Sequence, residues 1–214
     1  MIFRGCSAIL VAITYGYGKA GWRVRYRQGE TFAGAEADEL LSGTEFNDCT
    51  FKNCRWAGVR IQNSSFLGCT FVGCALSGVV FSFCQMREVW LENCSFRSIA
   101  WGGLQGKSVL AQPFTSAREC AFQYNEFSGM ALSGFDFTSN SFSECIFDDC
   151  KLSGANFRRV RLGRSQFERC DLAKADFRDA ESYQIDLNTN TLKGARFSFP
   201  DVVALLDGTG IQIE

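Results

Sequence analysis

Cysteine is the residue type in this sequence that could most readily do chemistry. The chain of 214 residues contains 11 cysteines and no histidine. Thiolates bind zinc, exchange disulfides and act as nucleophiles, but zinc ribbons and redox motifs usually require CxxC pairs, and this sequence contains none. The absence of histidine also excludes serine–histidine triads and histidine–zinc sites. We therefore expect neither a metal nor another cofactor.

The cysteines follow a period of five residues that runs through most of the chain. Large apolar residues recur at every fifth position over 41–101 and again over 122–177, and the second run resumes after a gap at Ser182. These positions hold 15 of the 21 phenylalanines. A smaller residue precedes each large one by two positions, and this slot contains every cysteine except Cys6. Thiols in apolar surroundings are inert, so the pattern predicts reduced cysteines packed in a core.

A period of five fits neither an α-helix, with its spacings of three and four, nor an isolated strand. It fits a chain in which two inward-pointing residues of a short extended segment are followed by a corner. Four corners close a square, which predicts a solenoid with coils of about twenty residues, stacked at the ~4.8 Å spacing of strands. The charged residues between 126 and 186 all fall on outward positions of this pattern.

The segments SGANF, LAKADF, ERCDL, DDCKL and NDCTF resemble the A(D/N)Lxx consensus of the pentapeptide-repeat proteins. The resemblance covers about residues 40–200. It implies an all-β fold, a right-handed quadrilateral β-helix with a projecting loop and a short C-terminal capping helix. We expect a basic non-repeat segment at 1–30, the β-helix at 31–199 and a cap at 200–214. The first segment is interpreted as a basic arm, a disordered tail, an N-terminal cap or sequence translated from a start site upstream of the working one.

The two runs of the repeat are out of register by one residue, which indicates an insertion near 102–119. This interruption is similar to the projecting loop of the quinolone-resistance and albicidin-immunity branches of the family. The alternative is a tolerated surface insertion without a role. If the loop is functional, we expect it to contact a partner through Gln105, Lys107, Gln112, Pro113 and Phe114.

The end of the chain departs from the repeat after Phe197. Ser198 and Pro200 can begin a short helix, whose apolar side would cover the open end of the solenoid. The resemblance further implies a homodimer formed through this end. The expected cap and dimer residues are Phe197, Phe199, Val202, Leu205, Leu206, Ile211 and Ile213.

Charge provides the main indication of function. The formal net charge of −1 argues against direct binding of nucleic acid, yet residues 119–150 contain six acidic side chains and no basic one. The resemblance implies that a carboxylate-bearing rod of roughly duplex width imitates DNA and binds DNA gyrase or topoisomerase IV. The acidic side chains expected to do so are Glu126, Asp136, Glu144, Asp148 and Asp149.

A basic cluster at 158–169 departs from this picture. Either the acidic face lies elsewhere around the square, or these arginines pair with carboxylates on neighbouring coils. An interaction scaffold with a partner other than a topoisomerase is the alternative function. An enzyme is disfavoured because the sequence has no glycine-rich phosphate loop and a packed solenoid leaves no substrate cavity. We find no export signal and no apolar stretch long enough to span a membrane, so we expect a cytoplasmic protein.

Overall fold

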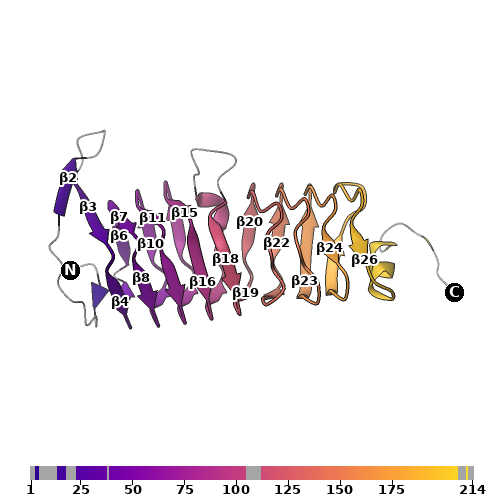
Figure 1. The fold of residues 1–214 in the computed structure, drawn as a ribbon, viewed down its shortest axis with the longest axis horizontal. Coiled ribbons are helices and arrows are strands. Elements are labelled where there is room, and N and C mark those ends of the chain that lie inside the picture. The colour runs from indigo at the N-terminus through magenta and orange to yellow at the C-terminus, as the bar shows by residue number, and fades with distance from the viewer. Residues whose placement is uncertain are drawn as a thin grey trace.

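The computed structural model describes residues 3–4, 14–17, 23–37, 39–104, 112–206 and 211. Short strands stack into a long rod, with the N-terminal strands at one end and the C-terminal strands at the other (Figure 1). Phe66 pairs with Phe46 on one side and with Met86 on the other, so each regular coil contains 20 residues. The predicted all-β, four-sided solenoid is confirmed.

The four sides of the rod are named here by the first strand of each, in chain order. The β3 face comprises β3 (Arg23–Gln28), β7 (Thr44–Asn47), β11 (Ser65–Leu67) and β15 (Gln85–Arg87), and continues as bridges through Ala131, Lys151, Asp171 and Thr191. The β4 face comprises β4 (Thr31–Ala33), β8 (Thr50–Lys52), β12 (Thr70–Val72), β16 (Val89–Glu92), β18 (Phe114–Arg118), β24 (Asp176–Phe177) and β26 (Arg196–Phe197).

The other two faces lie opposite these, because the chain passes through the four sides in turn. The β5 face comprises β5 (Glu36–Ala37), β9 (Arg55–Ala57), β13 (Ala75–Ser77), β17 (Ser95–Arg97), β19 (Ala121–Gln123), β21 (Ser141–Ser143) and the start of β23 (Arg161–Glu168). The β6 face comprises β6 (Leu40–Ser42), β10 (Arg60–Gln62), β14 (Val80–Ser82), the 3-10 helix η1 (Trp101–Gly103), β20 (Glu126–Ser128), β22 (Ile146–Asp148), the end of β23 and the end of β25 (Glu181–Ile185). The start of β25 pairs with the start of β23 on the β5 face.

Stacking begins before residue 31, where the sequence pattern placed the start of the β-helix. Strand β3 pairs in parallel with β7 and belongs to the first coil. Two antiparallel strands also lie at this end: β1 (Phe3–Arg4) pairs with β5, and β2 (Thr14–Tyr17) pairs with β3. Since an unpaired edge strand can template aggregation, these two strands protect two sides of the first coil.

The core consists of columns of side chains that run along the rod. Phe147 stacks between Phe127 and Phe167, with ring centroids 4.7 Å apart on both sides. The ten cysteines of the described residues are buried and reduced, as the pattern predicts. Their thiols also form hydrogen bonds: Cys74 Sγ, for example, donates to the backbone oxygen of Phe51 on the preceding coil, at 3.2 Å. Burial raises the pKa of the Cys84 and Cys145 thiols, which keeps them protonated and inert.

Two coils depart from the 20-residue length. At β18, Leu91 pairs with Ala117, 26 positions away, and the register shifts between Val89 and Trp90. In the last complete coil, Phe167 pairs with Ile185, only 18 positions away. Ile185 therefore takes the inward place that the period assigns to Leu187, and Leu187 is exposed. The 26-residue spacing continues on the next two faces, where Phe96 pairs with Phe122 and Ala100 bridges to Glu126, and the 20-residue spacing returns on the following coil. The 18-residue spacing is local, because the 20-residue spacing returns on the next face.

The C-terminal end of the rod carries the 3-10 helix η2 (Asp201–Leu206), where the sequence predicted a short helix. Val203 N donates to Pro200 O at 3.0 Å, so the helix begins directly after the proline. Leu205 is buried and Val202 packs against the core cluster. Helix η2 thus covers part of the open end.

Tyr183 is a point of weakness at this end. Its side chain is 3% exposed, and its hydroxyl has no hydrogen-bond partner among the described residues. Burial, with a smaller contribution from Asp201, raises the pKa of Tyr183 to about 12. An unpaired buried hydroxyl costs about 1–3 kcal/mol.

We expect Tyr183→Phe to increase the free energy of unfolding by about 1 kcal/mol at pH 7, because it removes this unpaired group. The tyrosine ionises in the unfolded chain near pH 10 but in the folded chain near pH 12. Wild-type stability should therefore fall by about 2–3 kcal/mol between these pH values, at 1.36 kcal/mol per unit. Urea unfolding across pH 8–12 measures both effects. If the Tyr183→Phe variant loses as much stability as the wild type between pH 10 and 12, the loss does not come from ionisation of Tyr183.

Candidate protein-interaction surface

The structure brings four of the five predicted acidic residues together. Glu126 and Asp148 project from neighbouring strands of the β6 face, β20 and β22. Glu144 lies at the corner before β22 and Asp149 at the corner after it, both with positive φ. Asp136 does not join them: it bridges to Asn156 on the β4 face, on the opposite side of the rod. The prediction of one face with all five residues is therefore wrong for Asp136.

Two further carboxylates extend this group. Glu168 pairs directly with Asp148, and Asp186 follows β25 on the next coil. The sequence carried a signal for Glu168, because it lies 20 residues, one full coil, after Asp148. We name the group of Glu126, Glu144, Asp148, Asp149, Glu168 and Asp186 the acidic surface.

Arginines of the basic cluster partly neutralise the acidic surface. Arg164 donates to Glu144 at 2.6 Å, and Arg169 forms an ion pair with Asp148. The arginine side chains of these pairs are 72% and 59% exposed, so solvent screens both interactions. The acidic surface keeps a net negative charge because, among the described residues, its six carboxylates form ion pairs with only these two arginines.

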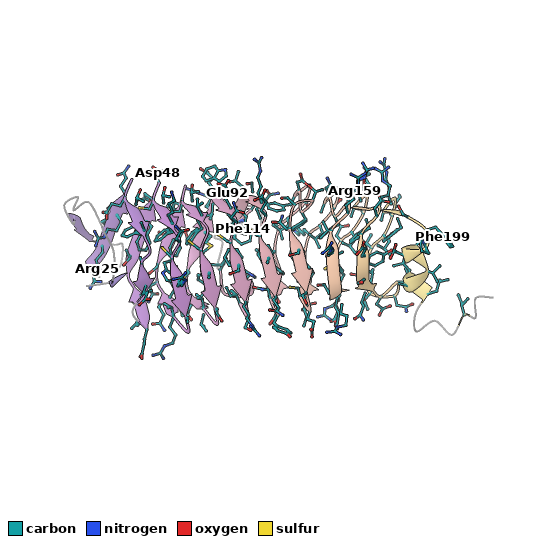
Figure 2. The ribbon with its side chains drawn as sticks, turned by 90° about the horizontal axis from the view of Figure 1, so that it is seen from below. Arg25, Asp48, Glu92, Phe114, Arg159 and Phe199 are labelled. Atoms are coloured by element: carbon teal, nitrogen blue, oxygen red, sulfur yellow. The ribbon has the colours of Figure 1, made fainter. Side chains whose placement is uncertain are left out.

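The other arginines of the basic cluster lie outside the acidic surface, at the corner between the β4 and β5 faces and on the β5 face itself. Arg158 and Arg159 both approach Asp179, at 3.8 and 3.7 Å. Figure 2 shows Arg159 at one edge of the rod, between Arg25 at one end and Phe199 at the other. Both sequence-based explanations of the cluster therefore hold: part of it pairs with carboxylates on neighbouring coils, and part lies away from the acidic surface.

The predicted loop contacts divide into three groups. Gln105 and Lys107 lie outside the described residues. Gln112 is exposed and its amide donates to Ser133 O at 2.9 Å. Pro113 is buried, and Phe114 is 3% exposed with its ring 5.1 Å from that of Trp101. Phe114 is therefore a core residue and not a surface contact, because β18 begins there and its pairing with Val89 turns the side chain inward.

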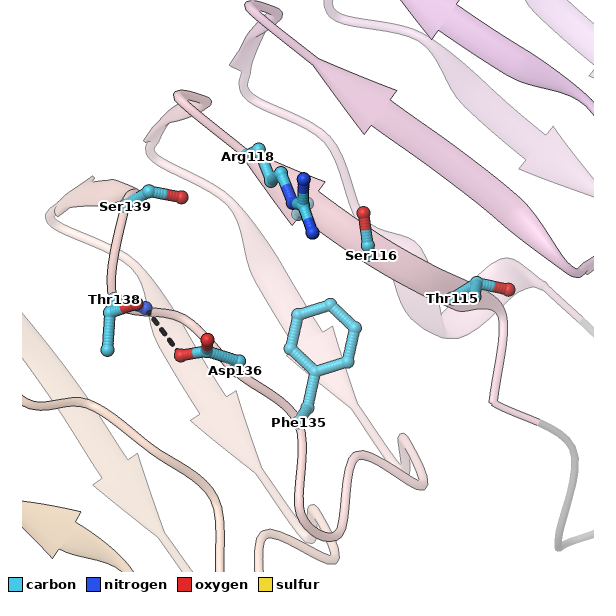
Figure 3. Close-up of a pocket in the computed structure, with 8 residues that line it drawn as sticks. Thr115, Ser116, Arg118, Phe135, Asp136, Thr138 and Ser139 are labelled. Carbon is cyan, nitrogen blue, oxygen red and sulfur yellow. Dashed lines mark hydrogen bonds between the residues drawn. The ribbon is translucent and has the colours of Figure 1, made fainter.

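A hollow opens on the β4 face just after β18. Its volume is about 470 Å³, and Thr115, Ser116, Arg118, Phe135, Asp136, Thr138 and Ser139 line it (Figure 3). Among the described residues no strand pairing joins β18 to 135–139; Asn140 Nδ2 donates to Ala117 O at 2.8 Å instead. Phe135 occupies a slot that holds cysteine, valine or alanine on other coils, and its size accounts for the interruption of the ladder here.

This hollow offers little for catalysis. The Asp136 carboxylate accepts a hydrogen bond from its own turn, from Thr138 N at 3.1 Å, and no thiol or imidazole lines the hollow. Within the described part of the chain, no group of three or more Cys, Asp or Glu side chains is arranged to hold a metal ion.

The predicted dimer residues lie at the C-terminal end with different exposures. Phe199 is 82% exposed and Ile211 is 58% exposed, whereas Phe197, Val202 and Leu206 are half-buried and Leu205 is buried. Ile213 lies outside the described residues. No helix in the part of the chain that the structure describes is long and apolar enough to cross a membrane.

Comparison with known proteins gives the family. The model of the pentapeptide repeat region matches residues 44–113 and 118–197, the two runs of the repeat on either side of β18's irregular start. No curated protein matches the chain in sequence. Solved structures similar to it include QnrB1 in a trypsin-treated form, described as a plasmid-mediated fluoroquinolone resistance protein, with 17% identity, a TM-score of 0.43, and coverage of 88% of this chain and 97% of that one.

A second similar structure is Rfr23, a pentapeptide repeat protein from the cyanobacterium Cyanothece 51142. Its identity is 15% and its TM-score 0.35, over 61% of this chain and 88% of that one. The repeat match alone spans well over half of the sequence. The chain belongs to the pentapeptide repeat family.

Proposed function

We propose that this protein binds DNA gyrase or topoisomerase IV through its acidic surface and protects the enzyme from a quinolone or a gyrase-directed toxin. The observation that carries the proposal is the position of Glu126, Asp148, Asp149 and Glu168 on and beside one face of a rod. Carboxylates spaced along a rod can occupy a cleft that is built for DNA phosphates. The protein acts by binding and not as an enzyme.

In the proposed complex the C-terminal end forms a two-fold contact between two copies, which doubles the length of the rod. Phe199 and Ile211 would be covered in that contact, and both are now exposed. The segment between Leu104 and Gln112 would add further contacts to the enzyme.

The first test is gyrase supercoiling with increasing amounts of the protein, with and without ciprofloxacin. The proposal predicts that the wild type restores supercoiling in the presence of the drug. A variant in which residues 105–111 are replaced by glycine and serine at equal length should lose this rescue, and it leaves the core residues Leu104 and Phe114 in place.

The second test neutralises the acidic surface with a Glu126→Gln, Asp148→Asn, Asp149→Asn variant. We expect its affinity for gyrase to fall at least about tenfold at low salt, because it loses charge complementarity. The matched control Glu119→Gln, Asp136→Asn, Asp171→Asn removes the same charge from other sides of the rod and should bind like the wild type. Surface plasmon resonance at two salt concentrations measures the affinity of both variants for gyrase.

An interaction scaffold with another partner is the alternative. The ion pairs of Glu144 and Asp148 with arginines favour it, because they reduce the negative charge that would imitate DNA. If micromolar protein neither rescues nor inhibits supercoiling and does not bind gyrase, the topoisomerase proposal is refuted and the scaffold remains. Equal loss of affinity in both charge variants would refute the specific role of the acidic surface.

A further inference from the structure

Phe83 has an unusual backbone conformation for an aromatic residue. Its φ is 55°, in the left-handed region that suits glycine and asparagine, and its side chain is 68% exposed. The same corner holds Gly43 and Asn63 on the two preceding coils. Among the described residues, Phe83 takes part in no ring contact. Positive φ is common at the corners of this rod, where Tyr124 also has a φ of 56°, but Phe83 is the more exposed of these two aromatic residues.

Phe83 lies at the corner after β14, between the β6 and β3 faces, and two exposed apolar residues lie on the β6 face before this corner. Val80, at the start of β14, is 52% exposed, and Ala100 bridges to it from the next coil and is also exposed. We name Val80, Phe83 and Ala100 the apolar patch. Hydrophobic side chains scattered singly on a surface need no explanation, but these three residues lie on two adjacent coils, on and at the end of one face.

The apolar patch borders the acidic surface directly. Ala100 bridges to Val80 on one side and to Glu126 on the other, so a single coil separates Val80 from the first carboxylate. Along this row of the β6 face, Val80 and Ala100 are therefore followed by Glu126 and then by the exposed Ile146. Interfaces commonly combine a buried aromatic anchor with surrounding charged groups that guide the partner into place.

We propose that Phe83 is the anchor with which this protein docks on its partner, and that the partner presents an apolar pocket beside a basic surface. The inference rests on the proposed function and deepens it, because the same basic partner would contact both the acidic surface and the apolar patch. The carboxylates attract and orient the partner, and the Phe83 ring fills the pocket and slows dissociation.

The backbone conformation of Phe83 supplies a test in which binding and stability change in opposite directions. Phe83→Asn places a residue favoured at positive φ in this corner, so its melting temperature should rise by about 1–3 °C. Its affinity for gyrase should fall at least about tenfold, chiefly through faster dissociation. Phe83→Leu keeps an apolar side chain and should retain most of the affinity.

Arg159→Asn is the matched control. Arg159 also has a positive φ, of 60°, and is exposed, but it lies at the diagonally opposite corner, between the β4 and β5 faces. Its melting temperature should rise by a similar amount, and its affinity should stay within about twofold of the wild type, since it lies away from the docking face.

The outcomes separate this inference from the function on which it rests. A wild-type protein that does not bind gyrase refutes both. A wild-type protein that binds, together with a Phe83→Asn variant of unchanged affinity, refutes the anchor alone. The Phe83→Asn variant is also compared with the wild type by sedimentation. If it loses self-association while its affinity for gyrase is unchanged, the apolar patch forms a contact between copies and the inference is overturned.

Discussion

Replacing Phe147 with alanine should lower the free energy of unfolding by about 4 kcal/mol, which is typical of a large aromatic residue lost from a packed core. The Phe147 side chain is fully buried. Its ring stacks on Phe127 and Phe167 and meets Phe157 edge-on, at 6.1 Å. The cavity left by alanine cannot be filled locally, because the backbone of each coil is held by strand pairing to both neighbours.

The melting temperature measures this loss, at about 2–4 °C per kcal/mol for a chain of this size. The control is Leu40→Ala, at a position that is 49% exposed and outside the proposed contact between copies, which should change stability by less than about 1 kcal/mol. A Phe147→Ala variant as stable as the control would contradict the continuous aromatic column. Because each coil contacts only its neighbours, we also expect the unfolding transition to become less cooperative.

Replacing Asn125 with alanine should cost about 3 kcal/mol, although asparagine is a polar residue in an apolar column. Asn125 is 1% exposed. Its Oδ1 accepts a hydrogen bond from Trp101 Nε1 at 3.1 Å, and its Nδ2 donates to Phe96 O at 2.8 Å and to Gln123 O at 2.9 Å. Alanine leaves the buried Trp101 donor and the Phe96 acceptor without their partner, which costs more than the loss of a hydrogen bond alone.

Asn125→Cys is the informative comparison. One coil later, Cys145 occupies the same slot and its thiol donates to Phe122 O at 3.4 Å. A cysteine at position 125 should restore the donor to Phe96 but not the acceptor for Trp101, so we expect a loss of about 1–2 kcal/mol. Urea unfolding of both variants tests the order of stabilities. Equal losses would show that the Trp101 contact, and not the backbone carbonyl, accounts for the role of Asn125.

These hydrogen bonds revise the role of the small slot that precedes each large residue. The sequence pattern predicts cysteine there as a small, inert packing residue. In the structure Cys74, Cys145 and Asn140 each donate to a backbone oxygen 23 positions earlier, on the preceding coil. Cysteine suits the slot because it combines small volume with a donor, and asparagine replaces it where the regular ladder is interrupted, as at 117–140.

The acidic surface and the apolar patch follow from the same geometry. A coil of 20 residues places side chains that are 20 apart in the sequence next to one another, as with Asp148 and Glu168. Surface charge can therefore accumulate along one face without any change to the core. This separation allows the rod to vary its partner while its inward columns keep the fold.

The period of five by itself determined the solenoid, the inward columns and the outward charges of this protein. That information is local, because each corner depends on a few neighbouring residues. The relative position of the coils is not local: the 26-residue spacing at β18 buries Phe114, and the 18-residue spacing at β25 exposes Leu187. The sequence could also not place Asp136, because the face that a residue occupies depends on every insertion before it. Only the tertiary structure decided which carboxylates share a face, since strand pairing between coils, and not the repeat, sets the register.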